Sequence, residues 1–140
     1  STHCISSAAS DVYKRQYLMM AEIANMEGGD VASYINKIRE RAYGKNWDAT
    51  KYGYTNGNFT ENELAILHEK DKEMLGEGQR WYDLKRMTLT KGGKHLVFCP
   101  EGSKDGQKAI LTEAEAYKLY WPIETNMITK DPELTQTPGY

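Results

Sequence analysis

The sequence predicts a mainly α-helical fold built of antiparallel helical hairpins, long irregular loops and an extended C-terminal tail. Three observations predict it. Apolar residues recur at helical spacing in several segments, the stretches between those segments are aperiodic and rich in glycine, asparagine and threonine, and only Gly28-Gly29 separates the first two periodic segments. Because two amphipathic helices on so short a turn can cover their apolar faces only by folding back, they form a hairpin.

Residues 1–16 are small, polar and aperiodic, and they resemble translated adaptor sequence more than a folded segment. We therefore predict that 1–16 is a non-native or disordered leader and that the domain occupies residues 17–140. Helical periodicity starts abruptly at Tyr17, as it would if the chain entered a helix partway along its length.

The first predicted helix runs from Tyr17 to Met26, with an apolar stripe of Met19, Ile23 and Met26. Asp30 is expected to cap the second helix, because its carboxylate can accept from the freed amides of the first turn. The apolar stripe of this second helix comprises Val31, Tyr34, Ile35, Ile38 and Ala42. The pair has the form of one tetratricopeptide-like unit, of which the chain shows a single copy.

Helix-capping residues and helix-breaking residues predict where the other elements begin and end. Residues 44–59 are predicted to form a loop, after which Thr60 and Glu63 make a capping box for a third helix that ends near Gly76. A fourth helix contains the apolar residues from Trp81 to Met87, and residues 95–98 are predicted to form a short strand.

The C-terminal part shows the same signals. Thr112 and Glu115 repeat the capping-box pattern ahead of a short helix that Pro122 closes, since proline cannot sit in a helix interior. The tail from Thr129 onward is predicted to run in extended form over the helices.

Composition excludes some function classes. With 18 basic and 20 acidic residues the net charge is −2, which provides no long-range field for nucleic acid or anionic lipid. A hydrophobic content of 39% with 27% charged residues is typical of a folded chain rather than a disordered one. Ten Tyr and three Trp against two Phe favour surfaces that meet sugars or partner proteins, although such rings also pack between helices.

No residue pattern predicts catalysis, metal binding or a cofactor. Residues 68–73 bring a histidine close to acidic residues but lack the second histidine of a helical zinc site, so we expect a solvated face with ion pairs such as Glu69 with Lys72. Cys4 and Cys99 have neither metal-site nor disulfide-framework spacing. No serine or cysteine stands in a nucleophile setting, and no glycine-rich phosphate loop is present in the sequence.

Ordered blocks in the second half of the chain point to a family. Residues 77–84 read Glu-Gly-Gln-Arg-Trp-Tyr-Asp-Leu, and they are followed by Trp-Pro-Ile and a closing Leu-Thr-Gln-Thr-Pro-Gly-Tyr. The residues that carry the pattern are Glu77, Gly78, Arg80, Trp81, Asp83, Trp121, Pro122, Pro138, Gly139 and Tyr140. In this order they resemble the C-terminal part of the SusD/RagB family, over about residues 17–140. Glu124 and Thr137 are mild departures, where a second proline and an asparagine are usual.

The resemblance implies a non-catalytic surface lipoprotein that captures glycans or other nutrients and works with a TonB-dependent transporter in the outer membrane. It implies no cofactor and no nucleic-acid partner, and it places the lipid anchor, the export signal and much of the binding surface in parts that precede this segment. For the motif block we infer structural roles. Gly78 would allow close helix approach, Arg80 would bind a buried carboxylate, and Trp81 would fill a core site.

Within this chain, Trp47, Tyr52, Tyr54 and Asn56 are the predicted ligand-binding residues, because rings and amides gather there where no helical period demands them. The alternative is that these rings only attach the loop to the helices. Tyr117, Tyr120 and Trp121, like Trp81, are expected in the core or against the transporter. A second functional hypothesis is a tetratricopeptide-type scaffold that binds peptides.

Overall fold

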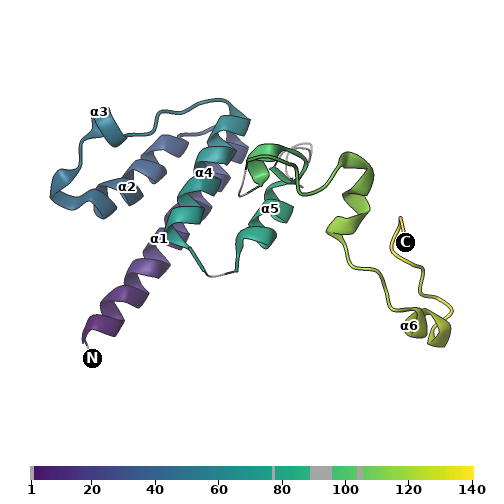
Figure 1. Cartoon of the computed structure of the whole chain (residues 1–140). Coiled ribbons are helices and arrows are strands. Elements are labelled where there is room, and N and C mark those ends of the chain that lie inside the picture. The colour runs from purple at the N-terminus through teal and green to yellow at the C-terminus, as the bar shows by residue number, and fades with distance from the viewer. Residues whose placement is uncertain (1, 77, 89–95, 104–105) are drawn as a thin grey trace. The chain divides into compact units, whose positions relative to one another are not determined.

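The computed structural model describes residues 2–76, 78–88, 96–103 and 106–140 (Figure 1). The chain divides into two compact units, residues 1–83 and 84–140, each with its own architecture. The described residues form helices, turns and irregular segments and contain no strand. The predicted mainly α-helical, tetratricopeptide-like class is therefore confirmed.

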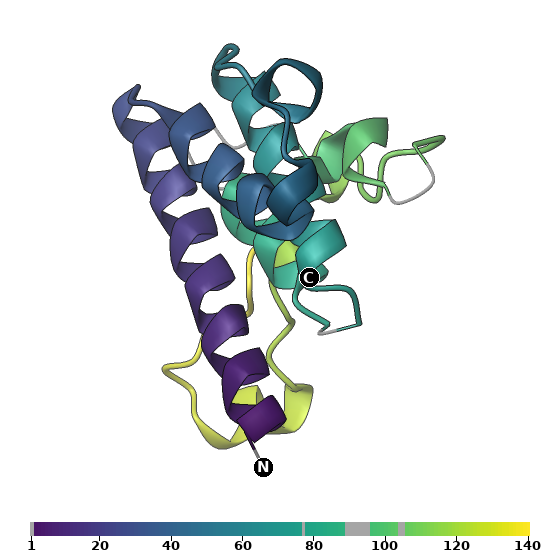
Figure 2. The ribbon, with the colours of Figure 1, turned by 90° about the vertical axis from the view of Figure 1, so that its left-hand side faces the viewer.

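The first unit opens with the predicted hairpin of α1 (Thr2–Glu27) and α2 (Val31–Tyr43), which run antiparallel in Figures 1 and 2. Gly28 ends α1 in the left-handed region at φ +74°, a conformation that favours glycine. Its N–H and that of Gly29 donate to carbonyls of the last turn at 3.3 and 2.6 Å, which is the Schellman arrangement. This turn reverses the chain.

Asp30 caps α2 as predicted. Its carboxylate accepts from the Ser33 amide at 3.2 Å. Val31, Ile35 and Ile38 of the predicted stripe are buried, Tyr34 is half-buried, and Ala42 is exposed near the end of the helix. The predicted apolar face of α2 is therefore the core face over most of its length.

The predicted apolar face of α1 is wrong. Met19, Ile23 and Met26 are 57%, 52% and 41% exposed, whereas Leu18 and Ala21 are completely buried. The helix packs against both α2 and α4, and the small Ala21 side chain lets neighbouring helices approach closely. Helical spacing marks a possible face but does not say which face another helix will cover.

The start of α1 also differs from the prediction. The helix begins at Thr2, so residues 2–16 are helical rather than disordered. A non-native origin for residues 1–16 stays a prediction.

The helix α4 (Phe59–Glu73) lies beside α1 and supplies Ile66 and Leu67 to the core of the first unit. Its capping box is formed by Asn58 and Glu61, with reciprocal bonds of 2.9 and 2.8 Å, and not by the predicted Thr60 and Glu63. Both pairs have the right spacing, but Glu63 is 3% exposed and belongs to the buried face.

Between α2 and α4 the predicted loop contains two short helical turns, η1 (Gly44–Asn46) and α3 (Ala49–Tyr52). Asp48 caps α3, because its carboxylate accepts from the Thr50 hydroxyl at 2.6 Å and from the Thr50 amide at 2.9 Å. These two bonds hold the pKa of the Asp48 carboxyl below its usual value. The third helix ends at Glu73 rather than near Gly76. The fourth predicted helix is confirmed as α5 (Arg80–Thr88).

The second unit contains η2 (Leu96–Phe98), which is a 3₁₀ turn where a strand was predicted; residue 95 lies outside the described residues. Its chain turns back at once through η3 (Pro100–Gly102). A Cβ on Gly102 would overlap the Leu96 carbonyl oxygen, so the two turns pack backbone to backbone. Among the described residues there is no strand with which residues 96–98 could pair.

The capping box of Thr112 and Glu115 is confirmed, but it opens a 3₁₀ helix, η4 (Glu113–Leu119). The Lys118 side chain, with the Thr112 amide and hydroxyl, lowers the pKa of Glu115 to about 2. The helix α6 (Thr125–Lys130) precedes a tail with turns but no helix. No helix in the described ranges is both long and apolar enough to cross a membrane.

Candidate functional site

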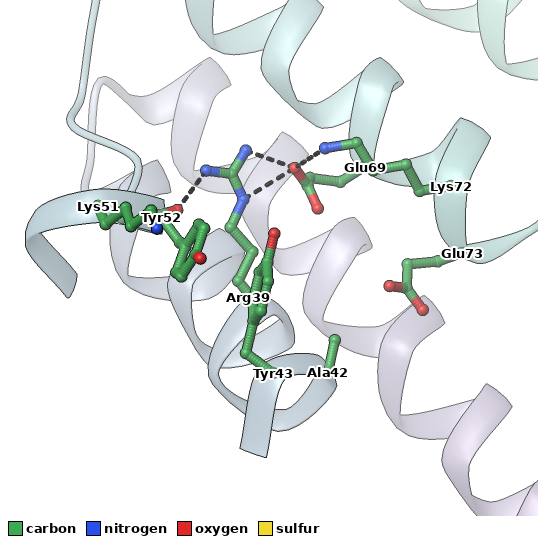
Figure 3. A pocket seen from close by; sticks show the side chains of 9 residues that line it. Arg39, Ala42, Tyr43, Lys51, Tyr52, Glu69, Lys72 and Glu73 are labelled. Atoms are coloured by element: carbon green, nitrogen blue, oxygen red, sulfur yellow. Dashed lines mark hydrogen bonds and ion pairs between the residues drawn. The ribbon is translucent and has the colours of Figure 1, made fainter. Parts of the chain in front are cut away.

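A pocket with a volume of about 370 Å³ opens in the first unit where α2, α3 and α4 meet (Figure 3). Its walls combine cations, carboxylates and two tyrosine rings. The lining residues are Arg39, Ala42, Tyr43, Lys51, Tyr52, Gly53, Glu69, Lys72 and Glu73. A concave site with rings and converging polar groups is the usual form of a small-ligand site.

The centre of the pocket is an ion pair between α2 and α4. Arg39 donates through Nε and Nη2 to Glu69 Oε1 at 2.9 and 2.5 Å, and Lys72 Nζ donates to the same oxygen at 3.0 Å (Figure 3). The Glu69 side chain is 2% exposed. The predicted pair of Glu69 with Lys72 is confirmed, but the predicted solvated face is wrong here, because Glu69 and Lys70 are buried. Arg39 is the partner that the sequence analysis missed.

The same arginine holds the predicted ligand loop. Arg39 Nη1 donates to the Tyr52 carbonyl oxygen at 2.8 Å, so α3 is tied to α2 through one guanidinium. Three of its five N–H groups make these bonds, and the Arg39 side chain lines the pocket. Arg39 is therefore both a structural anchor and a donor at the site.

The rings at the pocket form one cluster. Tyr43 and Tyr52 are stacked with centroids 4.2 Å apart and planes 13° from parallel, and the Trp47 ring lies 6.3 Å from that of Tyr43. The Lys51 ammonium stands 5.1 Å from the Tyr52 centroid. Trp47 and Tyr52, predicted from the sequence, thus come together with Tyr43, which was not predicted.

Tyr54 is placed differently. Asn36 pairs with its backbone in both directions, since the Asn36 amide donates to the Tyr54 carbonyl at 3.0 Å and its oxygen accepts from the Tyr54 amide at 2.7 Å. The Tyr54 hydroxyl donates to Asn62 Oδ1 at 2.7 Å, and burial raises the pKa of this phenol. The polar atoms of Tyr54 therefore attach the loop to α2 and α4.

Asn56 also bonds within the protein. Its amide donates to Asp30 Oδ1 at 2.7 Å, and its oxygen accepts from the Ala32 amide at 2.8 Å. The Asn56 bond, together with the Ser33 amide, holds the pKa of Asp30 below its usual value. Asn56 thus extends the cap of α2 and anchors the far end of the loop.

The residues that the sequence analysis missed are Arg39, Tyr43, Lys51, Glu69, Lys72 and Glu73, which lie in or next to helices. One signal could have found two of them. Arg39 and Tyr43 are four residues apart on α2, on the flank outside the apolar stripe, and so share one helix face.

The structural roles inferred for Gly78 and Trp81 in the motif block are wrong. Gly78 has φ +69° and no atom within 4 Å of a Cβ built on it, so its conformation rather than close helix approach requires glycine. Arg80 pairs with Asp71, whose side chain is 36% exposed. Trp81 is itself 36% exposed and does not fill a core site. Glu77 lies outside the described residues.

Asp83 belongs to a buried ionic cluster that joins three helices. Lys70 of α4 is 6% exposed, donates to Asp83 Oδ1 of α5 at 2.9 Å and also bonds to Glu22 of α1. One buried cation is thus paired with two carboxylates from other helices, so each of these charges is compensated within the protein.

The closing motifs bind each other in the second unit. The Gln136 side chain accepts from the Ile123 amide at 2.8 Å and donates to the Ile123 carbonyl at 2.9 Å, as a neighbouring strand would. Thr137 Oγ1 donates to the Trp121 carbonyl at 3.0 Å. We call this arrangement of residues 121–123 and 136–137 the C-terminal clasp.

The last residues complete the attachment. Gly139 has φ +102°, and a Cβ there would lie 2.5 Å from Tyr117 Cβ, so no larger residue fits. Tyr140 packs edge to face on Tyr117 with centroids 5.0 Å apart, and its hydroxyl donates to the Tyr120 carbonyl at 3.2 Å. Pro122 and Pro138 are exposed.

The clasp leaves one large ring in solvent. Trp121 is 86% exposed and Tyr120 is 48% exposed, so neither is a core residue. Tyr117 is half-buried. The Trp121 carbonyl accepts one hydrogen bond, from Thr137, so the backbone that carries this exposed ring is tied to the C-terminal clasp.

Within the described ranges, no three His, Cys, Asp or Glu side chains gather as ligands of a metal ion would. Cys99 is a free, half-buried thiol whose pKa is raised by burial.

Comparison with known proteins agrees with this architecture. The model of the SusD family matches residues 16–140. A crystal structure of a SusD superfamily protein from Bacteroides fragilis superposes with a TM-score of 0.77 at 62% identity, over 91% of this chain and 27% of that one.

Two curated relatives also match. The starch-binding protein SusD of Bacteroides thetaiotaomicron is 31% identical over 124 residues, which is 89% of this chain and 20% of the relative. The SusD-like protein P25 of Formosa agariphila is 40% identical over 72 residues, which is 50% of this chain and 13% of the relative. The chain thus spans a fifth or less of the curated relatives. With the family model matched over nearly its whole length, the chain belongs to the SusD family.

Proposed function

We propose that this chain is part of a non-catalytic surface protein that binds glycans at the outer membrane and delivers them to a TonB-dependent transporter. The observation that carries the proposal is the ring cluster of Trp47, Tyr43 and Tyr52 at the edge of a polar pocket, in a chain of the SusD family. The similar protein from Bacteroides thetaiotaomicron is described as starch-binding.

The cluster suits a sugar because the C–H faces of a pyranose pack on aromatic rings while its hydroxyls need fixed donors and acceptors. Arg39 and Lys72 supply N–H groups next to the rings, and Glu69 and Glu73 supply oxygens. Tyr54 and Asn56, of the four predicted binding residues, would act by holding the loop in place so that little entropy is lost when the ligand binds.

Ring removal tests the proposal. Trp47→Ala and Tyr52→Ala should each weaken glycan binding about fivefold to tenfold, the equivalent of about 1–1.4 kcal/mol for one ring contact. Tyr82→Ala is the matched control, because Tyr82 is 67% exposed on α5 and lies outside the pocket. The measurement is a glycan array followed by titration of the best binder, with circular dichroism to check folding.

If both ring variants bind as the unchanged chain does, the loop is not the site. A peptide-binding scaffold is the alternative that the helical hairpin alone would allow. It would be supported if a peptide panel, and no glycan, bound the chain.

For the transporter we propose the displayed Trp121 ring as a contact. Its exposure, its fixed backbone and its neighbour Tyr120 fit an interface anchor, since tryptophan and tyrosine are enriched at such positions. Trp121→Ala in the full-length protein should reduce co-purification with its transporter by about tenfold or more, while glycan binding is unchanged. Equal co-purification would exclude this contact.

A further inference from the structure

We propose that the pocket between α2, α3 and α4 selects glycans that carry a carboxylate, such as uronic acid units. This inference rests on the proposed function and specifies its ligand class. It follows from the charges that line the pocket, where cations outnumber carboxylates and Lys51 makes no ion pair among the described residues.

The pocket is positive although the chain is not. Its lining contains three cations, Arg39, Lys51 and Lys72, against two carboxylates, Glu69 and Glu73, whereas the whole chain has a net charge of −2. A concave surface of one sign attracts ligands of the other sign more strongly than a flat one does, because its walls focus the field.

Both carboxylates are already paired. Glu69 Oε1 accepts from Arg39 and from Lys72, and Glu73 lies 2.5 Å from the ammonium of Lys14 on α1. Neither acid is therefore left to repel an anionic sugar. The Lys14 contact adds a fourth positive charge beside the pocket.

Lys51 is the cation with the least compensation. Its described contact is with the face of the Tyr52 ring, at 5.1 Å from the centroid, and it makes no ion pair among the described residues. A cation–π contact at an exposed site is weak, so a ligand carboxylate can replace it without net loss. The ammonium would then bind the carboxylate while the sugar ring packs against the uncovered aromatic cluster.

Arg39 and Lys72 complete a donor set for the same ligand. Two of the five N–H groups of Arg39 are not used by Glu69 or Tyr52. The Lys72 side chain is 62% exposed and donates one N–H to Glu69. Charge-assisted bonds from such groups to a carboxylate are about twice as strong as bonds to a neutral hydroxyl. The preference is thus for acid over neutral sugar, not for glycans in general.

The test compares trigalacturonate with its methyl ester, in which each carboxylate is replaced by an uncharged ester group. Both probes are titrated into the chain, and binding is followed by tryptophan fluorescence and amide chemical shifts. We expect the acid to bind about tenfold tighter than the ester at low salt. This affinity ratio should fall several-fold at about 0.5 M NaCl, because the Debye length there is only a few ångströms and the charges are screened. Lys51→Gln should reduce the ratio to about threefold. Lys37→Gln is the matched control, because Lys37 lies over Tyr17 outside the pocket and should leave the ratio unchanged.

The outcomes separate the two proposals. If acid and ester bind equally and the ring variants weaken the binding of both, the charge preference is wrong and the glycan-binding site stands. If a salt-sensitive preference for the acid exists but survives Lys51→Gln and Lys72→Gln together, the anion binds elsewhere and the inference is also wrong. If neither probe and no other glycan binds, both proposals fail.

Discussion

Replacing Arg39 by methionine is the sharpest test of how the fold positions the pocket. The change keeps the apolar stem of the side chain but removes the guanidinium, which makes two bonds to Glu69 and one to the Tyr52 carbonyl. Glu69, at 2% exposed, would keep only Lys72, whose side chain is 62% exposed. The variant therefore leaves the buried Glu69 carboxylate without most of its compensating positive charge.

The expected loss in free energy of unfolding is about 3 kcal/mol, the lower end of the range for breaking a buried ion pair, since Arg39 is partly exposed and Lys72 remains. This is a large share of the roughly 5–15 kcal/mol available to a small domain. Glu69→Gln keeps an acceptor for Arg39 and should cost less. The loss of stability in the double variant should be smaller than the sum of the two single losses by about 2 kcal/mol. This difference is the coupling energy of the Arg39–Glu69 pair.

The assay is urea unfolding at 25 °C followed by circular dichroism, with hydrogen exchange of the α3 amides as a local readout. Exchange in α3 should accelerate in Arg39→Met because the anchor on Tyr52 is lost. Arg41→Met is the control on the same helix, where the cation lies over the Tyr13 ring, and should cost less than about 1 kcal/mol. An Arg39→Met variant as stable as the Arg41→Met control, or a coupling below about 0.5 kcal/mol, would refute the reasoning.

Three further predictions concern caps and the clasp. Gln136→Leu should destabilise the second unit by about 2 kcal/mol and speed hydrogen exchange of the Ile123 amide, because the Ile123 N–H and C=O each lose a hydrogen bond. Exchange of this amide at the wild-type rate would contradict the prediction. Asn58→Ala should cost about 1 kcal/mol in urea unfolding and Thr60→Ala much less, and the reverse order would restore the capping box predicted from sequence. The pKa of Glu115 is about 2 in the folded chain and 4.5 ordinarily. The stability that ionised Glu115 gives the folded state is therefore fully present above pH 4.5 and is lost as the pH falls toward 2. Glu115→Gln should remove this dependence in an acid titration of the η4 amide shifts, and an unchanged profile would count against the pairing.

Sequence reasoning succeeded where a signal is local. The Asp30 cap, the turn at Gly28-Gly29 and the capping box of Thr112 each depend on residues within five positions, and the structure confirms them. The family motifs were also visible in the sequence alone. Their ordered blocks lead to the same family as the comparison with known proteins.

The same reasoning failed where two local solutions compete. Asn58 and Thr60 both precede a glutamate at capping-box spacing, and only the burial of Glu63 decides between them. The short strand predicted at 95–98 fails for a related reason, because a strand needs a partner and the chain instead turns back on itself at Gly102.

By itself the sequence determined the helical hairpin, its caps, the family and the aromatic character of the loop at Trp47 and Tyr52. Tertiary structure alone decided which face of α1 is buried, that Arg39 joins Glu69 across 30 positions, and that the Trp121 ring stands in solvent. The physical reason is that hydrogen bonds within one turn are set by spacing along the chain, whereas burial and charge pairing depend on which helices come together in space.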